Sequence, residues 1–253
     1  MSTKVKVCFN GCSFTAGEGF DSSQRKLHAY DCVLADQHNW DSDNIAVNGS
    51  SNHTIFLRSA RAIQSQQYNI VFTQWSALNR IWLSPGPETY YFINDLRHPD
   101  YSYRDLYINQ QDKKKLNQLL LLLNHDYQNI LDLVCYCRIL EQLAELNKTR
   151  LIFINGLVPW QSDLVQPLSQ DLDSALSKYT KEILDFENRN DREIINYFSK
   201  LQQQVSTLDF SNWVNMFDSF QSNVCDTAPA RHHPGVNSHQ WMINQINTYL
   251  GKL

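Results

Sequence analysis

The sequence predicts an α/β fold, a three-layer sandwich in which a central parallel sheet of about five strands carries helices on both faces. Short apolar runs typical of buried strands occur at residues 5–9, 45–47, 70–73 and 151–154. Longer stretches with helical spacing of apolar residues lie at 126–147 and 238–250. Because parallel neighbours are joined by crossovers that usually contain a helix, this order favours a parallel sheet covered on both sides.

The two helical segments can be followed residue by residue. Along 126–147 the apolar positions are Ile130, Leu131, Val134, Cys137, Leu140, Leu143 and Ala144. This segment ends at Asn147-Lys148, a reasonable C-terminal signal. The last segment carries its apolar face on Trp241, Ile243, Ile246 and Leu250. Both patterns predict helices that pack one face against the sheet.

The length fits a single domain over residues 1–253, at 29.5 kDa. Two stretches fit the alternating plan poorly: about 82–111 is rich in Tyr, Pro and Asp, and about 161–208 is polar and helical in character. We expect both to be excursions at the carboxyl edge of the sheet, where open α/β folds bind ligands. The second is a candidate for an all-helical lid.

Composition limits the classes of partner. Hydrophobic residues make up 42% and charged residues 19%, which supports a packed core. The net charge is −4 and the pI is near 6.0, so the chain has no overall basic footprint for nucleic acid. The one basic run, Lys113-Lys114-Lys115, is more typical of a solvated helix face. We therefore expect no nucleic-acid partner.

No signal peptide is visible in the first residues, and the longest apolar stretch, Leu119 to Leu123, is far too short to span a bilayer. These features predict a cytoplasmic protein with no membrane partner. Six cysteines are present, but a chain of this size does not need disulfides, and Cys135-Tyr136-Cys137 lacks metal-ligand spacing. Buried free thiols are the favoured interpretation.

A serine follows the first predicted strand, in Gly11-Cys12-Ser13. At a strand-to-helix turn its hydroxyl can face a cleft and its N–H can help to hold an oxyanion. The same residue type is also common in tight turns and at helix N-caps. Ser13 is therefore a candidate nucleophile. The case for a catalytic role depends on whether other segments supply a base and further oxyanion donors.

Three further segments supply those partners. Gly49, in Asn48-Gly49-Ser50-Ser51-Asn52, follows the second predicted strand and can offer an unobstructed N–H, although such residues are also ordinary turn formers. Asn79 follows the third strand and can donate from its amide. His233 lies in a late loop, and histidine is the usual base for a serine nucleophile. A zinc site is disfavoured because no Cys, His or carboxylate cluster has ligand spacing.

In this order, the four segments resemble the SGNH (GDSL-type) hydrolase family. The resemblance implies a flavodoxin-like sandwich and a serine esterase or acyl hydrolase that works through an acyl-serine without metal or cofactor. It implies Ser13 as nucleophile, the N–H groups of Ser13 and Gly49 as oxyanion hole, and His233 as base. His233 is followed by Pro234, as in the family.

The chain departs from the family pattern at three places. Cys12 stands where the family has the acid of Gly-Asp-Ser. In the family, an asparagine in the block after the third strand completes the oxyanion hole. Here that position is Ala77, two residues before Asn79. Losing one oxyanion donor typically lowers turnover about 10²–10³-fold. The acid expected three residues before the histidine is Ala230, so either Asp226 orients His233 or a Ser–His dyad operates.

The resemblance implies small acyl esters as substrates, with acetyl groups on carbohydrate among the candidates. Packing of an irregular loop is the favoured explanation of the aromatic residues in the first excursion, and stacking on sugar rings is the alternative: Tyr90, Tyr91, Phe92, Tyr101, Tyr103 and Tyr107. Two alternatives stay open, a non-catalytic carbohydrate-binding or structural module on the same fold, and an acyltransferase. The sequence does not indicate an oligomeric state.

Overall fold

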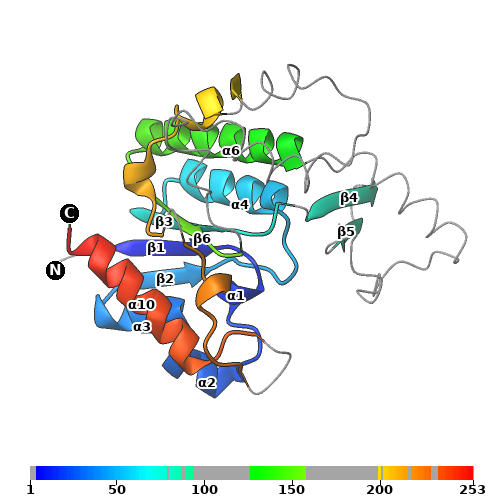
Figure 1. The fold of residues 1–253 in the computed structure, drawn as a ribbon. Coiled ribbons are helices and arrows are strands. Elements are labelled where there is room, and N and C mark those ends of the chain that lie inside the picture. The colour runs from blue at the N-terminus through cyan, green and yellow to red at the C-terminus, as the bar shows by residue number, and fades with distance from the viewer. Residues whose placement is uncertain are drawn as a thin grey trace, which may run out of the picture.

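The structure is a computed structural model that describes residues 4–78, 80–86, 89–93, 126–157, 199–200, 202–215, 218–228 and 233–252. Its centre is a parallel sheet of four strands in the order β2-β1-β3-β6 (Figure 1). The strands are β1 (Lys6–Asn10), β2 (Asp41–Asn44), β3 (Ile70–Trp75) and β6 (Arg150–Asn155). The predicted parallel α/β architecture is confirmed.

The strand order creates a switch point between β1 and β3. From β1 the chain moves outward to β2 and then returns across β1 to form β3 on the other side. The two neighbouring crossovers therefore leave the sheet in opposite directions, which opens a crevice at the carboxyl ends of β1 and β3. Beyond β6 a single parallel bridge joins Phe153 to Trp213, at the place of a fifth strand.

Three of the predicted strands are observed almost as expected, and the second is displaced. The second strand is Asp41–Asn44, not 45–47. At this edge of the sheet the strand pairs only with β1 through its backbone, so it needs no apolar side chains. The predicted run follows it, and the N–H groups of Ile45 and Val47 still donate to Phe9 O and Gly11 O, at 2.9 and 3.3 Å.

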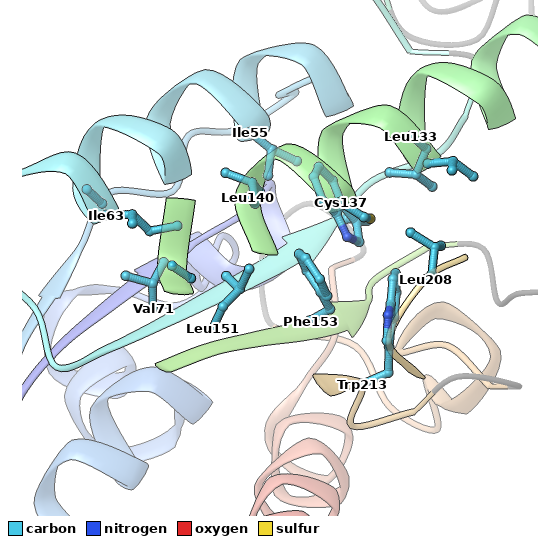
Figure 2. Close-up of a cluster of buried hydrophobic side chains, with 14 of the residues drawn as sticks. Ile55, Ile63, Val71, Leu133, Cys137, Leu140, Leu151, Phe153, Leu208 and Trp213 are labelled. Atoms are coloured by element: carbon cyan, nitrogen blue, oxygen red, sulfur yellow. The ribbon is translucent and has the colours of Figure 1, made fainter. Parts of the chain in front are cut away.

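Helices α4 (Asn52–Gln64) and α6 (Asp126–Asn147) cover one face of the sheet (Figure 1). Figure 2 shows their apolar side chains directed toward strands β3 and β6, with Leu140, Val71 and Phe153 among the buried residues. The predicted helix 126–147 is confirmed. Each large aliphatic side chain buried here contributes about 1.5–3 kcal/mol.

The opposite face is covered by α3 (Tyr30–Gln37) and α10 (Val236–Leu250). Tyr30, Leu34 and Met242 pack there against Phe9 and Phe72, whose rings stack at 4.8 Å. The predicted C-terminal helix is thus confirmed and begins two residues earlier than expected. Short elements complete this part of the chain: α1 (Ser13–Ala16), α2 (Ser22–His28), and the 3₁₀ turns η1 (Phe210–Asn212) and η2 (Gln221–Asn223).

The excursions are described only in part. Within the first, β4 (Ile81–Gly86) and β5 (Thr89–Ile93) form an antiparallel hairpin, and 94–111 lie outside the described residues. The side chains of its aromatic residues also lie outside the description. Of the second, residues 199–200 and 202–208 are described, so the expected helical lid is largely outside this range.

All six cysteines are free, as expected. Cys8, Cys12 and Cys137 are fully buried, Cys32 is half-buried, and the remaining two are exposed. Burial raises the pKa of Cys8 to about 12, so this thiol stays protonated in the core. Among the described helices, none has the length and apolarity needed to cross a membrane.

Candidate active site

Ser13 lies at the carboxyl end of β1, next to the switch point. β1 ends at Asn10, and Ser13 is the first residue of α1, with 4% of its surface exposed. The turn between them requires a glycine, because a Cβ on Gly11 would collide with Thr15 and would lie 2.9 Å from Gln74 Cβ. The sequence thus places a nearly buried hydroxyl where ligands bind in this type of sheet.

A buried hydrogen-bond network fixes the short helix that carries Ser13. Thr15 Oγ1 donates to Gln74 Oε1 at the end of β3, and Tyr30 Oη donates to Thr15 Oγ1 at 3.0 Å. Asn44 Nδ2, from the end of β2, donates to Thr15 O at 2.7 Å. Helix α1 is therefore tied to three elements, and Ser13 has a fixed position.

Gly49 lies in the turn between β2 and α4, with a φ of 75° that favours glycine. The turn is closed by Ser50, whose N–H and hydroxyl donate to Val47 O at 3.2 and 2.7 Å. Neither the Ser13 N–H nor the Gly49 N–H donates to a partner within the described residues. The oxyanion hole formed by these two N–H groups stays a prediction.

Asn79 lies outside the described residues. A different asparagine connects this loop to the second block. Asn52 Oδ1, at the start of α4, accepts from the Ser76 N–H at 2.7 Å, directly after β3. Asn52 is 7% exposed, and its sequence position alone gives no sign of this contact. Its contact positions the start of the loop that contains Ala77.

His233 lies beside the turn that follows Ser13. Its ring packs edge to face on Phe14, with centroids 6.0 Å apart and planes at 80°. Its Nε2 is 3.5 Å from Glu18 Oε2, and both side chains are largely buried. Glu18 is anchored to the nucleophile's own backbone, because its N–H donates to Ser13 O at 3.0 Å.

The Ser13 hydroxyl makes no hydrogen bond with His233 in the described part of the chain. The structure therefore places His233 beside the turn that begins at Ser13, without a direct hydrogen bond between the two residues. In unliganded enzymes catalytic hydrogen bonds are often long and tighten when substrate binds. The Ser13–His233 pair stays a prediction.

Asp226 has a structural role at the start of α10. Its carboxylate accepts from the N–H groups of Asn237 and Ser238, at 2.8 and 2.9 Å, and from Ser238 Oγ at 2.6 Å. Partial burial raises the pKa of Asp226, but these hydrogen bonds outweigh it and hold the pKa below its usual value. No hydrogen bond joins Asp226 to His233 within the described ranges.

The structure reveals the surroundings of two further residues near the site, Glu18 and His239, which the sequence pattern does not predict. Glu18 is the carboxylate beside His233, and its only signal is its position in the same loop as Ser13. His239 is a buried core residue whose Nδ1 accepts from the Tyr30 N–H at 3.2 Å. Burial lowers the pKa of His239 to about 3, so its ring is neutral. His232 lies outside the described residues.

No family model matches the sequence, and no curated protein matches it. Similar solved structures include a GDSL-like lipase from Bacteroides thetaiotaomicron VPI-5482, which is 13% identical, with 98% of this chain and 88% of that chain covered and a TM-score of 0.42. A variant of Axe2, an acetyl-xylooligosaccharide esterase from Geobacillus stearothermophilus, is 12% identical, with 99% and 97% covered and a TM-score of 0.46. The acetyl xylan esterase AlAXEase is 10% identical, with 96% and 98% covered and a TM-score of 0.44. The activities in these names belong to those proteins.

Proposed function

We propose that the chain hydrolyses small acyl esters through an acyl-enzyme on Ser13. The observation that carries the proposal is the arrangement at the end of β1: a nearly buried serine begins a helix at the switch point, and His233 packs on the next residue, Phe14. A serine hydroxyl in a fixed position, an imidazole packed beside its turn and two N–H groups without a partner in the described residues are groups that acyl transfer requires.

In the proposed reaction the Ser13 oxygen forms a bond to the ester carbonyl carbon while His233 takes the hydroxyl proton. The N–H groups of Ser13 and Gly49 stabilise the resulting oxyanion, and Asn79 is a candidate third donor. The carbon–oxygen bond to the alcohol then breaks, and the alcohol leaves with the proton from His233. Water hydrolyses the acyl-serine by the same steps, and the acid product leaves.

We propose Glu18 as the carboxylate that stabilises the protonated His233 in this reaction. Its Oε2 is 3.5 Å from His233 Nε2, whereas the Asp226 carboxylate is engaged by the N-terminus of α10. A carboxylate at this distance favours the imidazolium that forms when the base takes a proton. The competing arrangements are a Ser–His dyad and an orienting role for Asp226. The turnover of Glu18→Gln and Asp226→Asn variants distinguishes among the three.

The test is hydrolysis of p-nitrophenyl acetate by the full chain and by Ser13→Ala and His233→Ala variants. We expect each variant to lose at least about 10³-fold in turnover. A conservative control is Ser42→Ala, an exposed serine on the edge strand β2, for which turnover should be unchanged. Turnover by Ser13→Ala equal to that of the unmodified chain would remove Ser13 as nucleophile.

A further measurement separates hydrolase from the other two candidates. If acyl groups pass to an added alcohol faster than to water, the chain is an acyltransferase. If neither ester turnover nor covalent labelling by a fluorophosphonate occurs, the site belongs to a non-catalytic module. Hydrolysis that depends on both Ser13 and His233 supports the esterase.

A further inference from the structure

Three asparagines of this chain are followed directly by glycine, in Asn10-Gly11, Asn48-Gly49 and Asn155-Gly156. In such a pair the backbone nitrogen of the glycine can attack the side-chain amide carbon of the asparagine, because glycine has no Cβ in the way. The attack needs an accessible amide and a backbone that can change its torsion angles. The three pairs share the same two residue types, so a difference in their reactivity has to come from the fold.

The first pair is held in the core. Asn10 is the last residue of β1 and is fully buried. Its side-chain amide donates to Ile55 O at 2.7 Å and to Ser59 Oγ at 2.8 Å, and both partners belong to α4. Packing around the glycine is tight, because a Cβ on Gly11 would lie 2.9 Å from Gln74 Cβ. Attack on this amide would break two buried hydrogen bonds and requires the end of β1 to open.

The third pair is held at the end of β6. Asn155 is 2% exposed, and its side-chain amide donates to Asn215 O at 2.9 Å. Its backbone carbonyl accepts in return from Asn215 Nδ2 at 3.0 Å. The glycine nitrogen is itself engaged, since the Gly156 N–H donates to Trp75 O at 3.0 Å. The attacking nitrogen and the amide are therefore both fixed by hydrogen bonds in this pair.

The Asn48-Gly49 pair lies in a turn and is not held in this way. Asn48 is exposed, and Gly49 is half-buried with a φ of 75°. The two residues are the centre of a turn closed by the Ser50 N–H, which donates to Val47 O at 3.2 Å. Within the described residues, no hydrogen bond engages the Asn48 side chain or the Gly49 N–H. The amide of this pair is thus open to solvent, and its backbone is outside the sheet.

We propose that Asn48 is a site of spontaneous deamidation, and that the fold directs this reaction to Asn48 and away from Asn10 and Asn155. The Gly49 nitrogen loses its proton to the solvent and forms a bond to Asn48 Cγ. The Cγ–Nδ2 bond then breaks, and Nδ2 leaves as ammonia after taking a proton from water. The product is a five-membered succinimide ring.

Water completes the reaction by opening the ring at one of its two carbonyl carbons. Opening at the former side-chain carbonyl leaves aspartate, and opening at the former backbone carbonyl leaves isoaspartate. The net reaction consumes one water and releases one ammonia, with no oxidant or reductant. The modification therefore requires only the solvent and the exposed turn.

The isoaspartate product bears on the candidate oxyanion hole, and this second half of the proposal rests on the proposed function. Isoaspartate routes the backbone through its side-chain carbons, so it adds one methylene to the turn before Gly49. It also places a carboxylate beside the Gly49 N–H, the candidate oxyanion donor. A displaced donor and a nearby negative charge both disfavour an oxyanion. Each converted chain should therefore lose about 10²–10³-fold in turnover, as for the removal of one donor.

The test is incubation of the folded full chain at pH 8 and 37 °C, followed by peptide mapping with mass spectrometry. Samples taken over several weeks give the fraction of each asparagine that has converted. Protein isoaspartate methyltransferase with labelled S-adenosylmethionine identifies the isoaspartate. We expect Asn48 to convert at least about tenfold faster than Asn10 or Asn155, because the buried pairs react only when their strands open. Equal rates at the three asparagines, or no conversion of Asn48, would overturn the proposal.

Two controls separate the fold from the local sequence. Asn39 is exposed like Asn48 but is followed by Trp40, so it should remain asparagine. Conversion of Asn39 as fast as that of Asn48 would show that exposure alone controls the reaction, without the glycine. In urea that unfolds the chain, the three Asn-Gly pairs should convert at similar rates. A preference for Asn48 that persists in urea would refute the role of the fold.

Turnover of p-nitrophenyl acetate by the same samples tests the second half. It should fall in proportion to the isoaspartate at position 48. The variant Asn48→Gln, whose longer side chain cyclises far more slowly, should begin at the same turnover and keep it. Conversion without a loss of turnover would refute the role of the Gly49 N–H and leave the deamidation standing. A fresh chain that hydrolyses no ester would refute the proposed function, and the peptide maps would still decide the deamidation.

Discussion

Replacing Asp226 by alanine separates a helix cap from a catalytic acid. The carboxylate accepts three hydrogen bonds from the first turn of α10, two from backbone N–H groups and one from a hydroxyl. Losing a capping carboxylate costs about 0.5–2 kcal/mol, and hydrogen bonds to a charged group lie toward the upper end. We therefore expect Asp226→Ala to lower the free energy of unfolding by about 2 kcal/mol.

The assay is urea unfolding followed by far-UV circular dichroism at pH 7, with Asp36→Ala as the control. A loss of about 2 kcal/mol corresponds to a fall of about 4–8 °C in Tm for a chain of this size. The control removes an exposed aspartate and should stay within about 0.5 kcal/mol. Equal unfolding free energies for the two alanine variants would refute the capping role.

The pH dependence has a definite sign. The native pKa of Asp226 is lowered, so its contribution is complete above the unfolded value of about 3.9 and is lost as the pH falls through the native pKa. The stability difference between Asp226→Ala and the unmodified chain should therefore shrink below about pH 4. A difference that stays constant from pH 7 to pH 2 would contradict the assigned hydrogen bonds.

The asparagine variant distinguishes the two roles directly. Asp226→Asn keeps one acceptor oxygen but places an amide NH₂ against a donor of the first turn of α10, so it should keep only part of the stability that Asp226→Ala loses. If Asp226 only caps α10, the ester turnover of the folded protein should be unchanged. If Asp226 orients His233, turnover should fall by up to about 10⁴-fold in a stable protein, as for the loss of a triad acid. That outcome would refute our assignment of Glu18.

Three further predictions concern the turn at Ser13 and the core. Glu18→Gln should lower kcat for p-nitrophenyl acetate by about 10²-fold or more while Tm changes little, and unchanged kcat would show that His233 needs no carboxylate. Gly11→Ala should destabilise the fold by about 1–3 kcal/mol in urea unfolding, because a Cβ has no room, and a neutral effect would contradict that close packing. His239 is neutral when folded and charges when unfolded, so stability should rise with pH between about 3 and 6.5, by up to about 1.4 kcal/mol per pH unit, and His239→Gln should remove that slope. An unchanged slope would mean that another group causes it.

The sheet was predictable where side-chain pattern and burial agree. Residues 70–73 and 151–154 are apolar because β3 and β6 are covered on both faces, and both strands were found. The edge strand β2 was missed because its sequence, Asp-Ser-Asp-Asn, carries no apolar signal. Its place is set by backbone hydrogen bonds to β1, which side-chain periodicity does not report.

The candidate site was predictable to the extent that its residues follow strands. Ser13 and Gly49 follow β1 and β2, so their position at the carboxyl edge follows from the order of elements. Glu18 was missed because its proximity to His233 depends on the path of a loop far along the chain, and loop paths leave no periodic signal. Sequence distance alone makes Asp226 one candidate acid for His233, beside a Ser–His dyad, because it does not show that the Asp226 carboxylate meets the N-terminus of α10.

The central claim is that Ser13 forms the acyl-enzyme, and intact-protein mass spectrometry tests it most directly. The chain is mixed with p-nitrophenyl acetate, quenched in acid within the first turnovers and digested for peptide mapping. Our account predicts a single acetyl group on the peptide that contains Ser13, absent from Ser13→Ala and from His233→Ala. An acetyl group on any other residue, or one that persists in Ser13→Ala, would contradict it.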